Sequence, residues 1–309
     1  KDSGDAHTVN GNGPFDTRNV GNPISYAVSN LALSGTDSSN YFLTGNSNSV
    51  SGSDGSITPR PIVFTAPVVS KVYDGGTTYS TTAGNLSTMA GVLVGGDTLT
   101  GMTLSYADKM AGANNRTVTP SGALITDGNG GNNYSVSYAA NNSSTITPLS
   151  ITLTAPIVSK VYDGTTNASG LATVSGGAFV AGDSLISDTL AYTEFHAGLG
   201  NKTVNVSNAL VHDALGADMS GNYQVNYLAN STSTITPRTL TASLTNAGTS
   251  KVYDGNANAP SGFTPTWGFS GFLSGDTTAT INTTSASYNS AHVATANQIT
   301  VAGLSINGI

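Results

Sequence analysis

The chain has 309 residues, of which only 9% are charged, and 17 acidic against 10 basic side chains give a formal net charge of −7. Basic residues this scarce and scattered exclude a nucleic-acid groove or a polybasic membrane surface, since both need clustered Lys and Arg. The lack of cysteine excludes disulfides, thiolate metal sites and a cysteine nucleophile. No apolar stretch approaches the roughly 18 residues of a membrane span, so no membrane span is expected.

Strand patterns run along the whole chain. Apolar and polar residues alternate with a period of two, which is typical of strands with one buried face. Such runs occupy residues 134–138, 151–155, 203–206 and 298–301. Turn-forming pairs separate the strands, for example Asp74-Gly75, Asp127-Gly128 and Gly130-Gly131. The sequence predicts an all-β fold of about six or seven short strands in each unit, without an amphipathic helix.

The hexapeptide Ser-Lys-Val-Tyr-Asp-Gly occurs three times, at residues 70–75, 159–164 and 250–255. An Ile-Thr-Pro tripeptide precedes each copy and ends at Pro59, Pro148 and Pro237, so both spacings are 89 residues (148 − 59 and 237 − 148). Repeats of 20–50 residues must stack to bury a core, whereas a unit of this length is able to fold alone. The chain is therefore expected to be a tandem array.

Fainter markers follow each hexapeptide in a constant order: a Gly-Asp pair, an aromatic residue and an Asn-Tyr pair. The markers are Gly96-Asp97, Tyr106 and Asn133-Tyr134, then Gly182-Asp183, Tyr192 and Asn222-Tyr223, then Gly275-Asp276 and Tyr288, and before them all Phe15 and Asn40-Tyr41. The expected domains are the C-terminal half of a repeat (residues 1–58), two complete repeats (59–147 and 148–236) and an incomplete one (237–309). We expect the chain to belong to a longer array.

Several short strands with frequent turns favour an immunoglobulin-like β-sandwich for each unit. A β-grasp-like unit with one helix is the alternative. Pro148 joins two strand patterns with almost no spacer, and proline biases its neighbour toward extended backbone. The units are therefore expected to form an elongated, semi-rigid rod.

The repeated hexapeptide supplies the candidate site residues, which we interpret as determinants of the fold. They are Lys71, Tyr73, Asp74, Gly75, Lys160, Tyr162, Asp163, Gly164, Lys251, Tyr253, Asp254 and Gly255. Glycine allows a turn with positive φ, Asp accepts nearby backbone amides, and Tyr covers the core edge while its hydroxyl reaches a backbone partner. One interpretation pairs each lysine with a carboxylate inside its own repeat, such as Asp97, Asp183 or Asp276; a Lys–Asn or Lys–Asp isopeptide crosslink is a second option.

Metal sites and catalysis are not expected. The four histidines, His7, His196, His212 and His292, lack a recurring ligand pattern, and His196 and His292 are interpreted as half-buried fillers beside an aromatic residue. Calcium is the one cofactor left open, at loops beginning at Asp37, Asp127 and Asp218, but each offers one carboxylate where Ca²⁺ prefers several. Asx-turns explain these loops. No motif of a known catalytic class is present, so no enzyme activity is expected.

The order Ile-Thr-Pro, Ser-Lys-Val-Tyr-Asp-Gly, Gly-Asp, Asn-Tyr, Ile-Thr-Pro resembles the YDG-type repeats of large bacterial surface proteins. The resemblance runs from about Phe15 onward. These proteins are similar to filamentous-haemagglutinin-type adhesins of Gram-negative bacteria, often exported by two-partner secretion. The resemblance implies an extracellular or surface-attached protein that acts in adhesion, aggregation or a biofilm matrix.

Two functions remain open at this point. The first is a non-catalytic stalk whose repeats contact one another and space or present a binding tip. The second is weak binding of extracellular polysaccharide or neighbouring fibres by each unit, made effective by avidity. It includes assembly into a filament by strand donation, with residues 15–58 as donor. Aromatic residues make up only 7% and lie mostly at strand positions expected to be buried, which favours the stalk.

Overall fold

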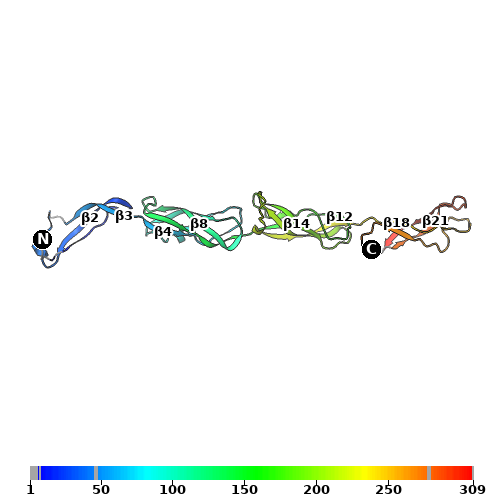
Figure 1. Cartoon of the computed structure of the whole chain (residues 1–309), viewed down its shortest axis with the longest axis horizontal. Coiled ribbons are helices and arrows are strands. Elements are labelled where there is room, and N and C mark those ends of the chain that lie inside the picture. Colours follow the sequence, from blue (N-terminus) through cyan, green and yellow to red (C-terminus); the bar gives the residue numbers. More distant parts are fainter. Residues whose placement is uncertain (1–5, 7, 45–47, 277–279, 308–309) are drawn as a thin grey trace. The chain divides into compact units, whose positions relative to one another are not determined.

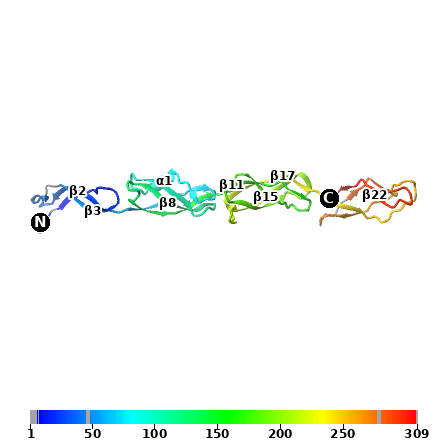
Figure 2. The same ribbon diagram turned by 90° about the horizontal axis from the view of Figure 1, so that it is seen from above.

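The structure is a computed structural model that describes residues 6, 8–44, 48–276 and 280–307. These residues are almost entirely β, as Figures 1 and 2 show. The predicted all-β fold is therefore confirmed. The chain divides into two compact units, each described by itself. The first comprises residues 1–150, 179–184 and 212–224, and the second comprises residues 151–178, 185–211 and 225–309.

The first unit begins with a three-stranded antiparallel sheet in the order β1-β2-β3. Its elements are β1 (Thr8–Asn12), β2 (Gly21–Ser34), the 3₁₀ helix η1 (Ser38–Asn40) and β3 (Val50–Ile57). In that order β3 is an edge strand, paired with β2 on one side.

Residues 59–147 follow with a five-stranded sheet, β5-β10-β8-β7-β6, and a two-stranded sheet, β4-β9. The strands are β4 (Arg60–Thr65), β5 (Ser70–Val72), β6 (Thr78–Tyr79), β7 (Thr98–Tyr106), β8 (Gly112–Thr126), β9 (Tyr134–Ala139) and β10 (Asn141–Thr147). The pairs β4–β9 and β5–β10 are parallel, and the other pairs are antiparallel. One residue, Pro148, separates β10 from the next strand.

Burial alternates along these strands as the sequence pattern predicts. In β4, Ile62 and Phe64 are buried while Val63 between them is exposed. Further buried side chains of this core come from both sheets: Leu99, Met102, Leu104, Tyr106, Val118, Tyr134 and Ile146. The core therefore lies between faces that the period-two alternation marks as apolar.

The structure contains one α-helix among the described residues, α1 (Ala83–Ala90), which corrects the expectation of no helix. Thr82 caps it: the Thr82 hydroxyl accepts the Asn85 amide, and the Asn85 side chain accepts the Thr82 amide. Such a capping box starts a helix without a long apolar stripe. Only Met89 of the helix is buried, which explains why the apolar pattern did not reveal it.

Most of the second unit is built on the strands of residues 148–236, in the sheets β13-β11-β16 and β12-β17-β15-β14. They are β11 (Leu149–Thr154), β12 (Ser159–Val161), β13 (Thr173–Gly176), β14 (Ser184–Tyr192), β15 (Gly198–His212), β16 (Tyr223–Leu228) and β17 (Asn230–Thr236), with the 3₁₀ helix η3 (Ser220–Asn222), which belongs to the first unit. The pair β12–β17 is parallel, like β5–β10. The core of the second unit includes Ile151, Leu153, Leu190, Tyr192, Val204 and Ile235.

The rest of the second unit forms three two-stranded sheets, β18-β19, β20-β23 and β21-β22. Their strands are β18 (Thr241–Leu244), β19 (Trp267–Ser270), β20 (Thr280–Asn282), β21 (Ser285–Tyr288), β22 (Ile299–Ala302) and β23 (Ser305–Asn307). None of the described residues from 236 onward is fully buried. This part of the unit is thus more open than the sheets before it.

The immunoglobulin-like sandwich stays a prediction. Immunoglobulin sheets are antiparallel, whereas the sheets here contain the parallel pairs β4–β9, β5–β10 and β12–β17. The helix of the β-grasp alternative has no consistent counterpart, because α1 lies in residues 59–147 and the corresponding part of residues 148–236 holds β13. Within the described residues, no helix is long and apolar enough to cross a membrane.

Candidate functional site

The repeated lysine binds the aspartate of its own hexapeptide. The Nζ–Oδ1 distances are 2.6 Å for Lys71–Asp74, 2.7 Å for Lys160–Asp163 and 2.9 Å for Lys251–Asp254. The partner is a carboxylate of the same repeat, as one interpretation of the sequence had it, but it is the aspartate of the hexapeptide and not Asp97, Asp183 or Asp276. The lysine and the aspartate are three residues apart, and the chain turns at the aspartate.

The aspartate and glycine form that turn in all three copies. Asp74 Oδ1 accepts the Gly76 amide at 2.9 Å, and Asp163 and Asp254 accept the amides two residues on in the same way. The glycines that follow have φ values of +78°, +74° and +79° for Gly75, Gly164 and Gly255. Only glycine adopts such angles without cost. We call this turn with its lysine the corner.

Charge and hydrogen bonding hold the corner carboxylates ionised. The hydrogen bond from Lys160, followed by that from the Thr165 amide, lowers the pKa of Asp163 to about 2. At Asp74, burial alone favours the neutral form, but Lys71 and the Gly76 amide together lower its pKa. The Lys71 Nζ also donates to the carbonyls of Gly76 and Thr78, at 2.7 and 3.2 Å. The ammonium is thus largely satisfied within the corner.

An aromatic residue anchors the corner to the sheet. Lys71 Nζ lies 5.6 Å from the centre of the Tyr106 ring, a cation–π distance, and Lys160 lies 5.4 Å from Tyr192. The Tyr106 hydroxyl donates to the carbonyls of Val69 and Thr145, at 3.1 and 2.8 Å, and so joins the strands β5 and β10 at that end. The aromatic marker after each Gly-Asp pair is therefore part of the same structure.

The tyrosine of the first hexapeptide reaches a side chain, and not the backbone partner that was expected. The Tyr73 hydroxyl donates to Asp183 Oδ2 at 2.8 Å, and Tyr223 donates to the same oxygen at 2.7 Å. The two rings meet edge to face, with centres 5.5 Å apart. Tyr73 is only 2% exposed. Burial, followed by the hydrogen bond to Asp183, raises the pKa of both tyrosines.

Further contacts in the first unit surround this pair. The Ala111 amide donates to Asn222 Oδ1 at 2.7 Å, and Lys109 Nζ lies 3.6 Å from Asp213 Oδ2. Asn222 is almost completely buried. We call these contacts, with Tyr73, Asp183 and Tyr223, the joint. It connects the end of residues 59–147 with the Gly-Asp and Asn-Tyr pairs of the following repeat sequence.

A second arrangement of the same kind lies at the other end of residues 59–147. Asp97, from the earlier Gly-Asp pair, accepts the Tyr134 hydroxyl at 2.6 Å and binds the guanidinium of Arg18. The Val20 amide donates to Asn133 Oδ1 at 2.8 Å, as Ala111 does to Asn222. The hydrogen bonds from Tyr134 and then Arg18 lower the pKa of Asp97. The Gly-Asp and Asn-Tyr markers thus act together at both places.

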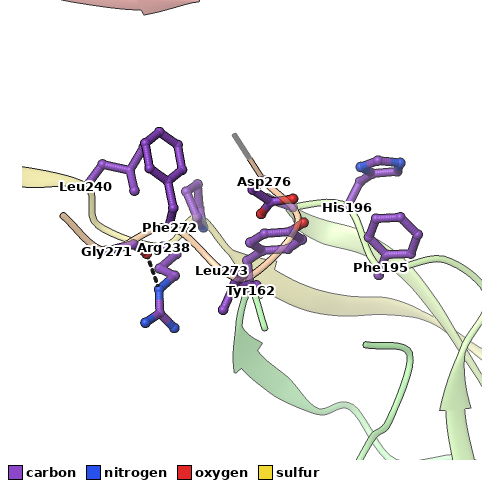
Figure 3. A pocket seen from close by; sticks show the side chains of 11 residues that line it. Tyr162, Phe195, His196, Arg238, Leu240, Gly271, Phe272, Leu273 and Asp276 are labelled. Carbon is purple, nitrogen blue, oxygen red and sulfur yellow. Dashed lines mark hydrogen bonds between the residues drawn. The ribbon is translucent and has the colours of Figure 1, made fainter. Parts of the chain in front are cut away.

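In the second unit, Tyr162 occupies the position that corresponds to Tyr73. Burial and a hydrogen bond to Asp276 raise its pKa. Figure 3 shows Asp276 beside the Tyr162 ring, at a cavity of about 430 Å³ that Phe195, His196 and Arg238 also line. Arg238 Nε donates to the Gly271 carbonyl at 2.7 Å, which is the dashed line of Figure 3. Unlike Tyr73, the third tyrosine of the series, Tyr253, is 64% exposed.

The histidine interpretation was wrong. His196 and His292 are exposed, and the His196 ring lies tilted against the Phe195 ring with ring centres 4.4 Å apart. His212 is partly exposed, and His7 lies outside the described residues. No group of three or more His, Asp or Glu side chains that could hold a metal ion occurs in the part of the chain that the structure describes.

The loop at Asp127 uses its carboxylate on the backbone. Asp127 Oδ1 accepts the amides of Asn129 and Gly131, both at 2.8 Å, and Oδ2 accepts the amide of Asn133 at 3.1 Å. Burial alone favours the neutral acid, but these three bonds together lower the pKa of Asp127. Asp218 accepts the Ser220 amide at 2.8 Å, and Asp37 accepts the Ala6 amide at 3.0 Å. The Asp127 and Asp218 loops contain the expected Asx-type hydrogen bonds.

Sequence reasoning did not identify Asp183 as the acceptor for Tyr73. The Gly-Asp and Asn-Tyr pairs were recognised as markers, but nothing in their spacing showed that they face the hexapeptide of the preceding repeat.

A protein-family model described as the YDG domain matches residues 1–49, 58–143, 147–234 and 236–309. No curated protein and no solved structure matches the chain. Since the model covers most of its length and the hexapeptide recurs within it, the chain belongs to the YDG domain family.

Proposed function

We propose that this chain is a run of non-catalytic stalk repeats in a large bacterial extracellular protein, an adhesin or biofilm-matrix fibre, that spaces or presents a binding tip. The observation that carries the proposal is the hydrogen bond from Tyr73 to Asp183. Through this bond, a residue of the recurring hexapeptide contacts the next repeat sequence. A side chain used in this way has a mechanical role, because it resists bending and separation of consecutive repeats.

The chemistry of the joint supports this role. Its hydrogen bonds link two buried tyrosines to one carboxylate and a buried amide to a backbone N–H. At 0.1 M, salt largely screens interactions between exposed charges that are more than about 10 Å apart, and it weakens buried bonds much less. A stalk outside the cell meets varying ionic strength, and a joint of this composition would keep its geometry there.

The connection between strands also supports a semi-rigid stalk. Pro148 alone separates β10 from β11, and proline restricts both its own φ and the residue before it. With strands rising about 3.3 Å per residue, each repeat would lengthen a rod by about 35–45 Å. Similarity to filamentous-haemagglutinin-like proteins exported by two-partner secretion, and a Gram-negative cell surface as the location, are part of the same proposal.

Small-angle X-ray scattering of the full chain tests the stalk. The expected result is an elongated particle at both low and high salt. The Asp183→Ala variant should keep its β content and show greater flexibility, while a matched change outside the joint, Asp188→Ala, should leave the scattering curve as it was. A compact particle for the unaltered chain would overturn the stalk.

A glycan array with the same protein separates the stalk from a polysaccharide-binding array. The stalk predicts no saturable binding to any immobilised glycan. Saturable binding that a single repeat reproduces would replace the proposal with binding by avidity.

A further inference from the structure

The first and last strand segments of residues 59–147 run side by side in the same direction. β4 is parallel to β9 from the pair Arg60–Tyr134 to the pair Thr65–Ala139, and β5 is parallel to β10. The chain has no turn or bend between β4 and β5, nor between β9 and β10. The two ladders therefore follow one another along a common direction, and the chain enters at one end of them and leaves at the other.

Tension along the chain loads both ladders in shear. Pro59 precedes β4 and Pro148 follows β10, so tension pulls β4 back toward its N-terminal end and β10 forward toward its C-terminal end. Because the paired strands are parallel, these two pulls are opposed along the strand axis. Sliding then has to break the hydrogen bonds of a ladder together, whereas pulling two strands apart from one end breaks the bonds one at a time.

A side chain from a third strand reinforces the β5–β10 pair. Around that pair, the Thr145 amide donates to the Val69 carbonyl at 3.0 Å, and the Tyr73 amide donates to the Thr147 carbonyl at 2.9 Å. The Tyr106 hydroxyl, from β7, bonds to the carbonyls of Val69 and Thr145. It bridges the two loaded segments and cannot keep both bonds if they slide.

These bonds lie away from water. The Val69 amide donates to the Ser144 hydroxyl at 3.1 Å, and Ser144 is fully buried. Ile146 is fully buried as well, and Tyr106 is only 3% exposed. A hydrogen bond in such surroundings is electrostatically stronger than one in water. Burial therefore adds to the resistance of the pair.

The corner anchors β5 to the rest of the sheet. Lys71, in β5, donates to the carbonyls of Gly76 and Thr78, and Thr78 begins β6, which pairs with β7. β7 pairs with β8, and β8 pairs with β10. The hexapeptide thus has a second task besides the joint, because it braces the strand that tension would displace.

The second unit contains the same arrangement, in which β12 is parallel to β17. Its bonds correspond one by one to those of the first unit: amide of Thr234 to carbonyl of Val158, amide of Tyr162 to carbonyl of Thr236, hydroxyl of Tyr192 to carbonyls of Val158 and Thr234, and amide of Val158 to hydroxyl of Ser233. Ser233 and Ile235 are fully buried. The arrangement is therefore a property of the repeat and not of one copy.

We propose that each of these two repeats is a tension-bearing clamp, in which the parallel first and last strand segments keep the repeat folded when the chain is pulled along its length. A spacer needs only length and stiffness, so the clamp goes beyond the stalk role. Its use by the organism rests on the proposed stalk. A compact particle in scattering would overturn the stalk alone, and weak resistance to pulling would overturn the clamp alone.

Single-molecule force spectroscopy of the full chain, held by tags at its two termini, tests the clamp. Residues 59–147 and 148–236 should each unfold in one abrupt event, and the two events should need similar forces. Each event should lengthen the chain by about 250–290 Å, the extended length of 89 residues less a folded length of about 35–45 Å. Steady extension without two such events would overturn the proposal.

The direction of pulling separates a clamp from general stability. The chain has no cysteine, so engineered pairs can serve as handles. Thr58→Cys with Ser150→Cys loads the ladders of residues 59–147 in shear, and Thr58→Cys with Asn132→Cys pulls at the starting ends of β4 and β9 and peels them apart. All three positions are exposed. The unfolding force should be several-fold lower in the peeling direction, and equal forces would overturn the clamp.

Tyr106→Phe tests the bridging hydroxyl in the chain held by its termini. Forced unfolding follows the unfolding rate, so the lifetime of each repeat is measured at constant tension. The lifetime of residues 59–147 should shorten about tenfold, while the other repeat keeps its lifetime and serves as the internal reference. Tyr192→Phe should shorten the lifetime of the other repeat instead.

Tyr138→Phe is the matched control, because the Tyr138 hydroxyl accepts the Ala123 amide and bridges no loaded pair. It should leave both lifetimes unchanged. Unchanged lifetimes in Tyr106→Phe, or an equal shortening in Tyr138→Phe, would overturn the role of the bridge. If Tyr106→Phe fails to fold, the comparison of pulling directions still decides, since it leaves every residue of the clamp in place.

Discussion

The Tyr73 hydroxyl donates to Asp183 Oδ2 at 2.8 Å, across 110 positions of sequence. The same carboxylate oxygen accepts Tyr223 at 2.7 Å. An ionised carboxylate is able to accept several hydrogen bonds, and two buried phenols need acceptors, so the three side chains satisfy one another. The hexapeptide is therefore both a local turn and one side of a joint, and its residues are expected to differ in what their substitution disturbs.

Gly75→Ala should destabilise the first unit more than Gly255→Ala destabilises the second. Both glycines have positive φ, and an alanine there costs about 1–2 kcal/mol. A Cβ at residue 75 would also lie 2.6 Å from Cγ1 of Val180, whereas a Cβ at residue 255 meets nothing within 4 Å. Overpacking adds about 1–3 kcal/mol. Urea denaturation measures the difference, and equal losses would contradict a close joint at Gly75.

Lys71→Met should cost about 1–2 kcal/mol, because it removes the donor to two carbonyls and leaves the Asp74 carboxylate without its cation. The ion pair itself contributes little, since Asp74 is largely exposed. Lys109→Met removes a longer contact with Asp213, made by a lysine that is more exposed than Lys71; it serves as the control and should cost well under 1 kcal/mol. Equal midpoints in urea for the two variants would show that the corner lysine is dispensable.

The joint should weaken in alkali. The raised pKa values of Tyr73 and Tyr223 mean that the folded state favours the neutral phenols. Their contribution is fully present below the unfolded pKa of about 10 and is lost as the pH rises toward the higher folded pKa. The thermal midpoint of the unaltered chain should therefore fall between about pH 9 and 11.

Tyr73→Phe lacks the titrating group and should show a shallower fall over the same range. Tyr138→Phe is the control, because the Tyr138 hydroxyl contacts the Ala123 amide and no carboxylate. It should keep the slope of the unaltered chain. Parallel curves for all three proteins would contradict the assignment of this pH dependence to the joint.

Asp127→Asn should destabilise its loop by about 1–3 kcal/mol, because an amide nitrogen would replace one of two oxygens that accept backbone N–H groups. Asp127 is 2% exposed, so water cannot substitute. Asp16→Asn, at an exposed position, should change stability by less than about 0.5 kcal/mol.

Calcium or a chelator should leave the thermal midpoint of the unaltered chain unchanged. A rise of several degrees in that midpoint with calcium would show that the loops bind calcium.

The strands could be predicted because the alternation of apolar and polar residues is visible within a short stretch of sequence. Residues 134–138 lie in β9 and residues 203–206 in β15, and Gly75 and Gly128 have the positive φ that their turn pairs suggest. Helix α1 was missed because a single buried side chain, Met89, leaves no periodic pattern. Local signals therefore predict local structure well.

Partners were harder to predict than elements. A repeat places every motif at the same phase in every unit, so the spacing of Tyr73, Asp97 and Asp183 is equally consistent with contacts inside a unit and contacts with the next. Packing decides between them: Tyr73 is buried by the residues around Asp183, and its lysine neighbour turns back to Asp74. Sequence pattern alone contains no information on that choice.

A double-mutant cycle between Tyr73→Phe and Asp183→Ala tests the joint most directly, with the free energy of unfolding measured in urea for the unaltered chain, both single variants and the double variant. Because the two side chains contact each other, their effects should be non-additive, with a coupling energy of about 0.5–3 kcal/mol. A cycle of Tyr73→Phe with Asp188→Ala, an aspartate outside the joint, should be additive. Additivity within about 0.3–0.5 kcal/mol for Tyr73 and Asp183 would contradict the central claim that the hexapeptide tyrosine holds the next repeat.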